Sequence, residues 1–164
     1  MINTAFLTDS PLFRNLDETE RVQILIIGQV RNYKKDDVIF HEGDAGDGLF
    51  IVVKGSIRIS RRSATGEEAL VILETPAFFG EMAIIDFSPR AADAIANEPT
   101  DLFFIPLKEL RSLIETDQQI ALKVLYALCE VMVQRLRETN ERYMSIFTIA
   151  QWSGGGSTGL IPLP

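Results

Sequence analysis

The chain has 164 residues, a length that suits one domain with a substantial core and is too short for two full ones. Its hydrophobic share of 46% and charged share of 24% are those of an ordinary folded domain, and its net charge is −7. Nucleic-acid binding depends on a clustered basic surface, and the only basic runs are Lys34-Lys35 and Arg61-Arg62, so we expect no direct contact with nucleic acid.

The sequence shows neither an export signal nor a membrane span. Residues 1–16 lack the continuous apolar core of a signal peptide, and no uncharged run approaches the roughly 20 residues that cross a bilayer. Cys129 is the only cysteine, which excludes a disulfide framework within one chain, and its apolar neighbours predict a buried structural role. We therefore expect a cytoplasmic protein without membrane contact.

The first predicted element is a helix that begins after Asp17. Asp17 suits the N-cap position, and Glu20, three residues on, completes a capping box. Apolar residues then continue to about Val30. We expect this helix to serve in packing.

Strand-like segments follow, with turns between them at regular intervals. The strands are predicted at residues 38–41, 49–53, 56–62 and 67–73, with turns at Gly43-Asp44, Lys54-Gly55 and Thr65-Gly66, and two more strands at 94–96 and 102–105. This spacing is typical of an antiparallel barrel or sandwich. The predicted fold class is mainly β with flanking helices, a jelly-roll-like β-roll over about residues 34–106.

Residues 78–92, FFGEMAIIDFSPRAA, place charged groups in an otherwise apolar run. Gly80 permits a tight turn before about one turn of helix, whose unpaired amides near residues 80–83 would attract an anion. Pro89 ends that helix and delivers Arg90 from a second direction, and arginine binds phosphate through a planar fork of donors. The small Ala91 and Ala92 let the backbone come close.

Glu81 gives this segment a second chemical preference. An ionised carboxylate only accepts hydrogen bonds, so beside a phosphate it needs donors such as sugar hydroxyls. A phosphate on Arg90 and a sugar on Glu81 together describe a nucleotide. The alternative is that Glu81 and Arg90 simply pair with each other, as in many structural ion pairs.

The C-terminal part is predicted to be helical. A short helix is expected at about 106–114 and a long one at about 117–150. Residues 120–133 are apolar on nearly every face, and Leu125, Leu128 and Met132 keep a heptad-like spacing, so we expect a homodimer through paired long helices. The Gly/Ser-rich residues 151–164 are predicted to be a flexible tail after a domain at 1–150.

The segment 79–84 with 89–92, together with HEGDAGDGLFIVVKGSI at 41–57, closely resembles the cyclic nucleotide-binding domains of the catabolite activator and fumarate-nitrate regulator type and of protein kinase A regulatory subunits. The resemblance extends at lower specificity to about residue 145. Family transcription factors carry a helix-turn-helix after the long helix, and no such segment follows here. We therefore expect a stand-alone sensor or the sensor half of a truncated regulator.

The resemblance implies roles for individual residues. The amides of Phe79, Gly80, Met82 and Ala83, with the Arg90 side chain, would hold the cyclic phosphate; Glu81 would bind the ribose 2′-hydroxyl; Ala91 and Ala92 would lie beside phosphate and base; and Val71 is a candidate base contact. On the long helix, Thr139 and Asn140 or, one turn earlier, Arg135 would reach the base.

Two sequence features bear on the choice of ligand. Ala91 lacks the hydroxyl that cyclic-GMP-selective relatives often carry after the arginine, which favours cyclic AMP. Asp93 replaces a residue that is more often threonine or serine in the family. Pointing inward, its charge would oppose the phosphate; pointing outward, it would be solvated and without effect.

The sequence has too few residues of the required types for a catalytic triad or a metal site. His41 is the only histidine, so histidine-dependent triads and metal sites of several histidines are not expected. Asp44 and Asp47 lack the twelve-residue calcium pattern and are predicted to be surface turn acids. We expect no enzyme, metal or cofactor. The leading hypothesis is a cyclic nucleotide sensor with an unidentified protein partner, and the alternative is a dimerisation scaffold that binds no nucleotide.

Overall fold

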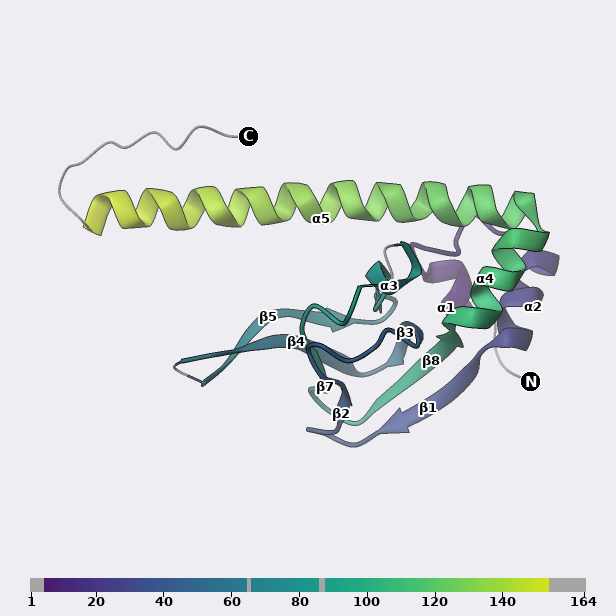
Figure 1. Cartoon of the computed structure of the whole chain (residues 1–164), viewed down its shortest axis with the longest axis horizontal. Coiled ribbons are helices and arrows are strands. Elements are labelled where there is room, and N and C mark those ends of the chain that lie inside the picture. Colours follow the sequence, from purple (N-terminus) through teal and green to yellow (C-terminus); the bar gives the residue numbers. More distant parts are fainter. Residues whose placement is uncertain (1–4, 65, 86–87, 154–164) are drawn as a thin grey trace. The chain divides into compact units, whose positions relative to one another are not determined.

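The computed structural model describes residues 5–64, 66–85 and 88–153 (Figure 1). The chain divides into two compact units, one ending at Ala127 and one beginning at Leu128. Of the predicted tail, residues 154–164 lie outside the described part of the chain. Among the described helices, none combines the length and apolar character needed to cross a membrane.

Helices and strands follow one another in the order labelled in Figure 1. The helices are α1 (Ala5–Asp9), α2 (Glu18–Ile27), α3 (Met82–Ile85), α4 (Leu107–Thr116) and α5 (Gln118–Ser153). The strands are β1 (Gln29–Tyr33), β2 (Val38–Phe40), β3 (Gly48–Lys54), β4 (Ser56–Ser63), β5 (Gly66–Glu74), β6 (Phe78–Phe79), β7 (Asp93–Ala96) and β8 (Thr100–Pro106).

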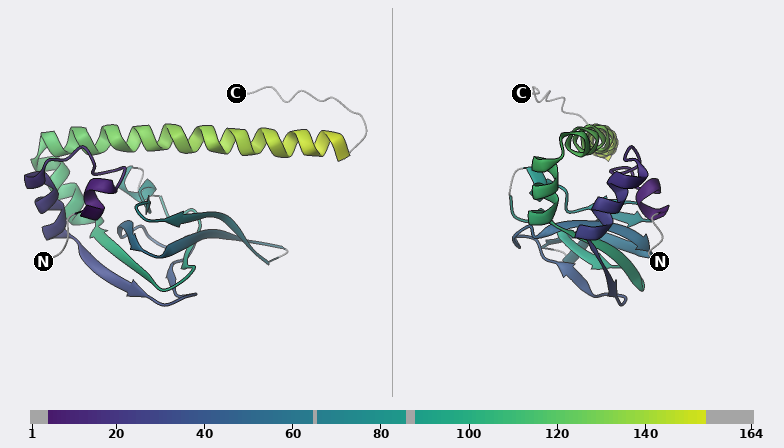
Figure 2. Two further views of the ribbon diagram at one scale, coloured as in Figure 1. Left: turned by 180° about the vertical axis from the view of Figure 1, so that it is seen from behind. Right: turned by 90° about the vertical axis from the view of Figure 1, so that its right-hand side faces the viewer.

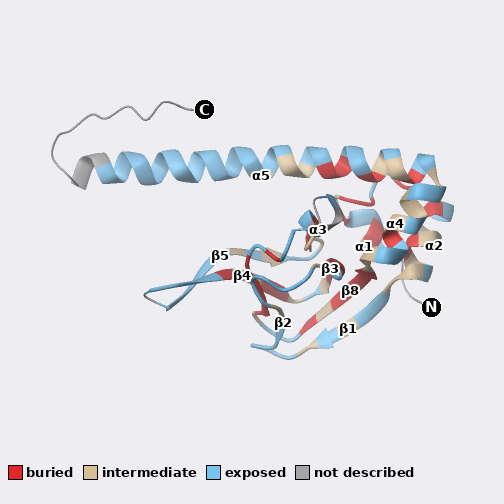
Figure 3. Cartoon of the chain, in the orientation of Figure 1, coloured by how far each residue is buried: buried red, intermediate tan, exposed pale blue. Residues whose placement is uncertain are grey.

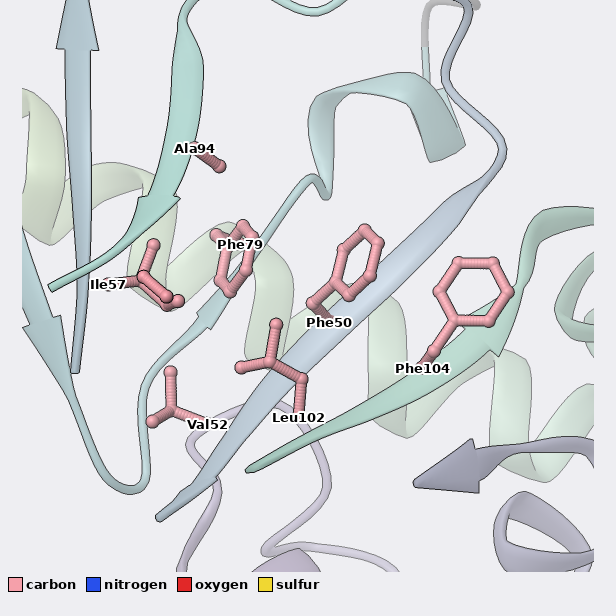
Figure 4. Packing of buried hydrophobic residues seen from close by; sticks show 8 residues of the cluster. Phe50, Val52, Ile57, Phe79, Ala94, Leu102 and Phe104 are labelled. Atoms are coloured by element: carbon pink, nitrogen blue, oxygen red, sulfur yellow. The ribbon is translucent and has the colours of Figure 1, made fainter. Parts of the chain in front are cut away.

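The first unit is built on two four-stranded antiparallel sheets. Their strand orders are β1-β8-β3-β6 and β2-β7-β4-β5. Apolar side chains from both sheets meet in one core, with Phe50 and Leu102 from the first sheet and Ile57 and Ala94 from the second (Figure 4). The predicted β-roll with flanking helices is confirmed.

Helices α1, α2 and α4 lie together at one end of the two sheets (Figure 2). Each contributes a fully buried apolar residue, Leu7, Ile24 and Leu110 respectively. Figure 3 colours the chain by burial and shows buried positions at this end of the roll. Burying such a side chain stabilises the fold by about 1.5–3 kcal/mol. These helices therefore close that end of the roll by apolar packing.

The start of α2 is fixed by the predicted capping box. The Glu20 amide donates to Asp17 Oδ1 at 2.9 Å, and the Asp17 amide donates to Glu20 Oε2 at 2.7 Å. Glu20 also accepts a hydrogen bond from Lys123 Nζ at 2.7 Å. The first turn of α2 is thus tied to the start of α5.

The predicted end of this helix was wrong. The helix stops at Ile27, and Gln29–Tyr33 is strand β1, so the roll begins before residue 34. Gly28 lies at this change of conformation and leaves room for the ring of Phe103. A Cβ at this position would lie 2.2 Å from Cζ of Phe103. The apolar run favours a helix locally, but pairing with β8 decides the conformation.

The surface of α5 also differs from the expectation. Leu128 is buried within its own chain, so Leu125, Leu128 and Met132 do not form an exposed seam. Cys129 is exposed, which corrects the predicted buried role. The physical reason is helical geometry, because neighbouring residues differ by about 100° around the axis and a buried Leu128 turns Cys129 toward solvent.

Candidate functional site

Gly80 forms the turn between β6 and α3. Its φ of +80° lies in the left-handed region that favours glycine. A Cβ at this position would lie 2.5 Å from Nη1 of Arg90 and 3.1 Å from the carbonyl oxygen of Gly48. The absent side chain therefore makes room for the guanidinium of Arg90.

Arg90 is buried, with a side-chain exposure of only 3%. Nη1 donates to the carbonyl of Gly80 at 3.0 Å, and Nη2 donates to the carbonyl of Gly48 and to Asp47 Oδ1, both at 2.8 Å. The guanidinium carbon lies 4.2 Å from the centre of the Phe40 ring. Buried arginines are rare without such partners, so these contacts hold a positive charge inside the roll.

One donor of Arg90 has no protein partner. Its Nε is buried and makes no hydrogen bond with any residue in the described part of the chain. A buried N–H left without an acceptor costs free energy, about 1–3 kcal/mol. The guanidinium can therefore donate to one further acceptor, either anionic or neutral.

The backbone of Arg90 is tied to the loop between β2 and β3. Its amide donates to the carbonyl of Asp44 at 2.8 Å, and its carbonyl accepts from the amide of Gly43 at 2.8 Å. Asp44 in turn accepts from the amide of His41 at 2.8 Å. The loop and the arginine segment thus hold each other in place.

Asp47 is the residue of this site that the sequence did not predict. Its side chain is 62% exposed, as predicted for a surface turn acid, and its carboxylate also pairs with Arg90. The available signal was the arginine itself, because a buried cation needs a counter-charge. The alternative considered from the sequence had paired Arg90 with Glu81.

Glu81 follows the Gly80 turn and is itself buried, with 6% exposed. It precedes α3, a helix of a single turn that includes Met82 and Ala83. Met82 is exposed, and the side chain of Ala83 lies outside the described part of the structure. The predicted carboxylate therefore lies beside the turn that cradles the guanidinium.

The remaining predicted residues are distributed around this centre. The ring of Phe79 stacks on Phe50 in the core, with centroids 5.1 Å apart and planes inclined by 10°, so its side chain serves in packing. Ala91 is exposed and Ala92 is buried. Val71 is half-buried and pairs with Ile59, which packs against the core, so it faces inward.

Asp93 points away from the core. Its neighbour Ala94 belongs to the core cluster, and strand alternation turns Asp93 to the opposite face of the sheet. Its carboxylate accepts from the amide of Glu42 at 2.7 Å and lies 3.5 Å from Nδ1 of His41. Asp93 therefore points outward, which is one of the two predicted orientations. It is not solvated as predicted, because its side chain is buried and anchors the β2–β3 loop.

The model of the family "Cyclic nucleotide-binding domain" matches residues 30–117 of this chain. A cyclic AMP receptor protein of Thermus thermophilus is 33% identical over 132 residues, which are 80% of this chain and 59% of that protein. A cAMP-dependent protein kinase regulatory subunit of Mycosarcoma maydis is 34% identical over 96 residues, 58% of this chain and 18% of that protein. The chain thus spans three-fifths or less of these relatives.

Among solved structures, a cyclic nucleotide-binding domain from Methylobacillus flagellatus aligns with a TM-score of 0.77 and 25% identity. The alignment covers 87% of this chain and 80% of that one. The similarity therefore includes most of the described fold.

Proposed function

This chain belongs to the cyclic nucleotide-binding domain family, and from that membership we propose that it is a non-enzymatic sensor of a cyclic nucleotide, cyclic AMP rather than cyclic GMP. The observation that carries the proposal is the buried guanidinium of Arg90, packed against Gly80 with one donor unpaired. A cation in such a site interacts strongly with an anion because little water screens it.

In the proposed complex, Arg90 binds the cyclic phosphate. The guanidinium is fixed by two carbonyls and by the Phe40 ring, so little side-chain entropy is lost on binding. Its partner, Asp47, is 62% exposed and is therefore the contact that a ligand would displace. Backbone amides that follow Gly80 supply further donors to the phosphate.

Glu81 binds the ribose. A buried carboxylate beside the phosphate site accepts hydrogen bonds from sugar hydroxyls and so distinguishes a nucleotide from inorganic phosphate. The inward-facing Val71 contacts the base, and Ala91 offers it no hydroxyl. This lack of a donor to the guanine base supports the choice of cyclic AMP.

Binding is transmitted to a dimer or to a protein partner. Helix α3 begins two residues after Gly80, so a ligand held there orders α3 and shifts the helices that come after the roll. The proposed dimer forms through α5, which is supported by its exposed apolar residues. The proposal places the protein in the cytoplasm, where a lone cysteine stays reduced.

A nucleotide-free dimerisation scaffold is the second candidate. It is favoured by the ion pair between Arg90 and Asp47, which neutralises the buried charge without any ligand. Thermal unfolding with cyclic AMP, cyclic GMP and plain AMP separates the two. A ligand at 100 times its dissociation constant adds about 2.7 kcal/mol to the free energy of unfolding. If neither cyclic nucleotide at millimolar concentration raises the melting temperature, the scaffold is correct.

A further inference from the structure

The segment that carries Arg90 is attached to the β2–β3 loop at two places. The backbone of Arg90 exchanges two hydrogen bonds with the loop, through the amide of Gly43 and the carbonyl of Asp44. Three residues later, the carboxylate of Asp93 accepts a hydrogen bond from the amide of Glu42 at 2.7 Å. Because the two attachments hold neighbouring residues of the loop, they fix its orientation as well as its position.

Asp93 carries a buried negative charge at the second attachment. Its side chain is 8% exposed, and a buried carboxylate needs hydrogen-bond donors or cations around it. Nδ1 of His41 lies 3.5 Å from Asp93 Oδ1, and Nε of Arg62 lies 3.8 Å from Asp93 Oδ2. Arg62 is 79% exposed, so water weakens its attraction to the carboxylate. The loop itself supplies the other two compensating groups, the amide of Glu42 and the ring of His41.

The position of Arg90 depends on this loop. Strand β7 begins only at Asp93, so Arg90 lies ahead of the strand, and its backbone bonds to the loop instead of to a neighbouring strand. The far end of the same loop contributes Asp47, which accepts a hydrogen bond from the Arg90 guanidinium. Loosening the loop at Asp93 would therefore change how the guanidinium is presented to a phosphate.

We propose that Asp93 is a positioning residue of the nucleotide site and that protonated His41 strengthens its hold on the β2–β3 loop. The inference rests on the proposed function, because it concerns how Arg90 is held for the cyclic phosphate. Asp93 lies on the outer face of the sheet and acts through the loop, without touching the ligand. A preorganised site binds more tightly, so the affinity for cyclic AMP rises when His41 gains its charge.

His41 makes this hold depend on pH. It is the only histidine of the chain, and histidine is the side chain that ordinarily changes its charge between pH 5 and pH 8. The other charged groups around His41 and Asp93 are Arg61 and Arg62 of β4, Glu67 of β5, and Glu42 and Asp44 of the loop. Hydrogen bonds from arginines lower the pKa of Glu42 and of Glu67, so both carboxylates stay ionised over this range. The change in charge beside Asp93 is therefore that of His41.

Calorimetric titration of cyclic AMP at pH 5.5 and at pH 7.5 tests the proposal. The wild type should bind more tightly at pH 5.5, by at most about fivefold, which is the limit for an ion pair of this exposure. The His41→Gln variant should show equal affinities at the two pH values. The Asp93→Asn variant retains an acceptor for the Glu42 amide but offers no charge to His41. It should bind about as tightly as the wild type at pH 7.5 and should not respond to pH.

The Asp93→Ala variant removes both contacts with the loop. Its affinity for cyclic AMP should be about fivefold lower or less at both pH values, because a hydrogen bond to a charged group is lost. Circular dichroism checks that this variant is folded, and Asp93→Asn and His41→Gln carry the test if it is not. Glu115→Ala, at an exposed position of α4, controls for the loss of a carboxylate and should leave the affinity unchanged.

Each contrary result has its own meaning. A folded Asp93→Ala protein that binds cyclic AMP as tightly as the wild type, or more tightly, overturns the positioning role of Asp93. A pH response that persists in Asp93→Asn assigns the effect to direct attraction between His41 and the phosphate, and overturns the coupling through Asp93. Equal wild-type affinities at the two pH values overturn the role of His41 while the proposed function stands. A wild type that binds no cyclic nucleotide at either pH overturns both.

Discussion

The guanidinium of Arg90 is joined to the carboxylate of Asp47 by a 2.8 Å hydrogen bond across 43 residues of sequence. The two side chains differ sharply in environment, because Arg90 is 3% exposed and Asp47 is 62% exposed. The cation is fixed inside the roll while its counter-charge lies toward solvent. In the proposed complex, the phosphate replaces the carboxylate without moving the arginine.

The Asp47→Asn variant is expected to be less stable than the wild type without ligand. Its melting temperature should rise more when ligand binds. The substitution removes the charge that compensates a buried guanidinium, a loss of about 1–3 kcal/mol given the exposure of Asp47. A bound phosphate restores the missing charge. Thermal unfolding should show a lower melting temperature without nucleotide and a larger rise with cyclic AMP than in the wild type. Equal rises in both proteins would contradict replacement of Asp47 by phosphate.

Gly80→Ala is expected to impair both folding and binding. The substitution introduces a left-handed strain of about 1–2 kcal/mol and a Cβ 2.5 Å from Nη1 of Arg90. Gly66→Ala is the matched control, since Gly66 also has a positive φ, of +126°, but no atom lies within 4 Å of its added Cβ. Calorimetry with cyclic AMP should detect weaker binding only in Gly80→Ala. Equal affinities of the two variants for cyclic AMP would show that Gly80 does not contribute to nucleotide binding.

Ala91→Thr is expected to shift the preference from cyclic AMP toward cyclic GMP. The added hydroxyl supplies a hydrogen-bonding group beside the arginine, and one hydrogen bond contributes about 1 kcal/mol, or roughly fivefold in affinity. Because Ala91 is exposed, the fold should tolerate the change. Calorimetric titration of cyclic AMP and cyclic GMP into the wild type and Ala91→Thr measures this preference. An unchanged ratio of the two affinities would show that Ala91 does not determine the specificity.

Glu67→Gln is expected to alter the pH dependence of stability. The Arg58 guanidinium donates to Glu67 Oε1 and lowers the pKa of Glu67 from its ordinary value of 4.5. Because the folded pKa lies below the unfolded one, ionised Glu67 stabilises the fold above the unfolded pKa and loses this effect as pH falls through the folded value. The side chains are partly exposed, so the gain at neutral pH is below about 1 kcal/mol.

Thermal unfolding between pH 3 and pH 8 checks this prediction. The wild type should melt at a higher temperature than Glu67→Gln at pH 7, and the two curves should converge below the lowered pKa of Glu67. Glu115→Gln, at an exposed position of α4, controls for the general loss of a carboxylate. A constant difference between wild type and Glu67→Gln over the whole range would show that the ion pair with Arg58 is not the cause.

Local sequence patterns predicted much of the roll. Alternating segments such as Ser56–Ser63 became strands because their apolar face is buried, and the capping box at Asp17 formed as its two residue types require. The strand Gln29–Tyr33 could not be predicted, since it is largely polar and follows the apolar run of α2 directly, and only pairing with the distant β8 makes it extended.

The site was predictable as a set of residue types and less so as contacts. Gly80 and Arg90 were paired by their chemistry, and they touch in the fold. Asp47 as the partner of Arg90 depends on how a loop folds back over the roll, which no local pattern encodes. The burial of Leu128 on α5 was missed for a similar reason, because it is decided by the tertiary fold.

The most direct measurement is calorimetric titration of cyclic AMP into the wild type, Arg90→Ala and Arg62→Ala, with circular dichroism to confirm that each is folded. Removing the buried cation should weaken binding by about 2–5 kcal/mol, roughly thirty-fold to several-thousand-fold. Arg62, whose side chain is 79% exposed, should be dispensable. A folded Arg90→Ala protein that binds cyclic AMP as tightly as the wild type would contradict the proposed nucleotide site.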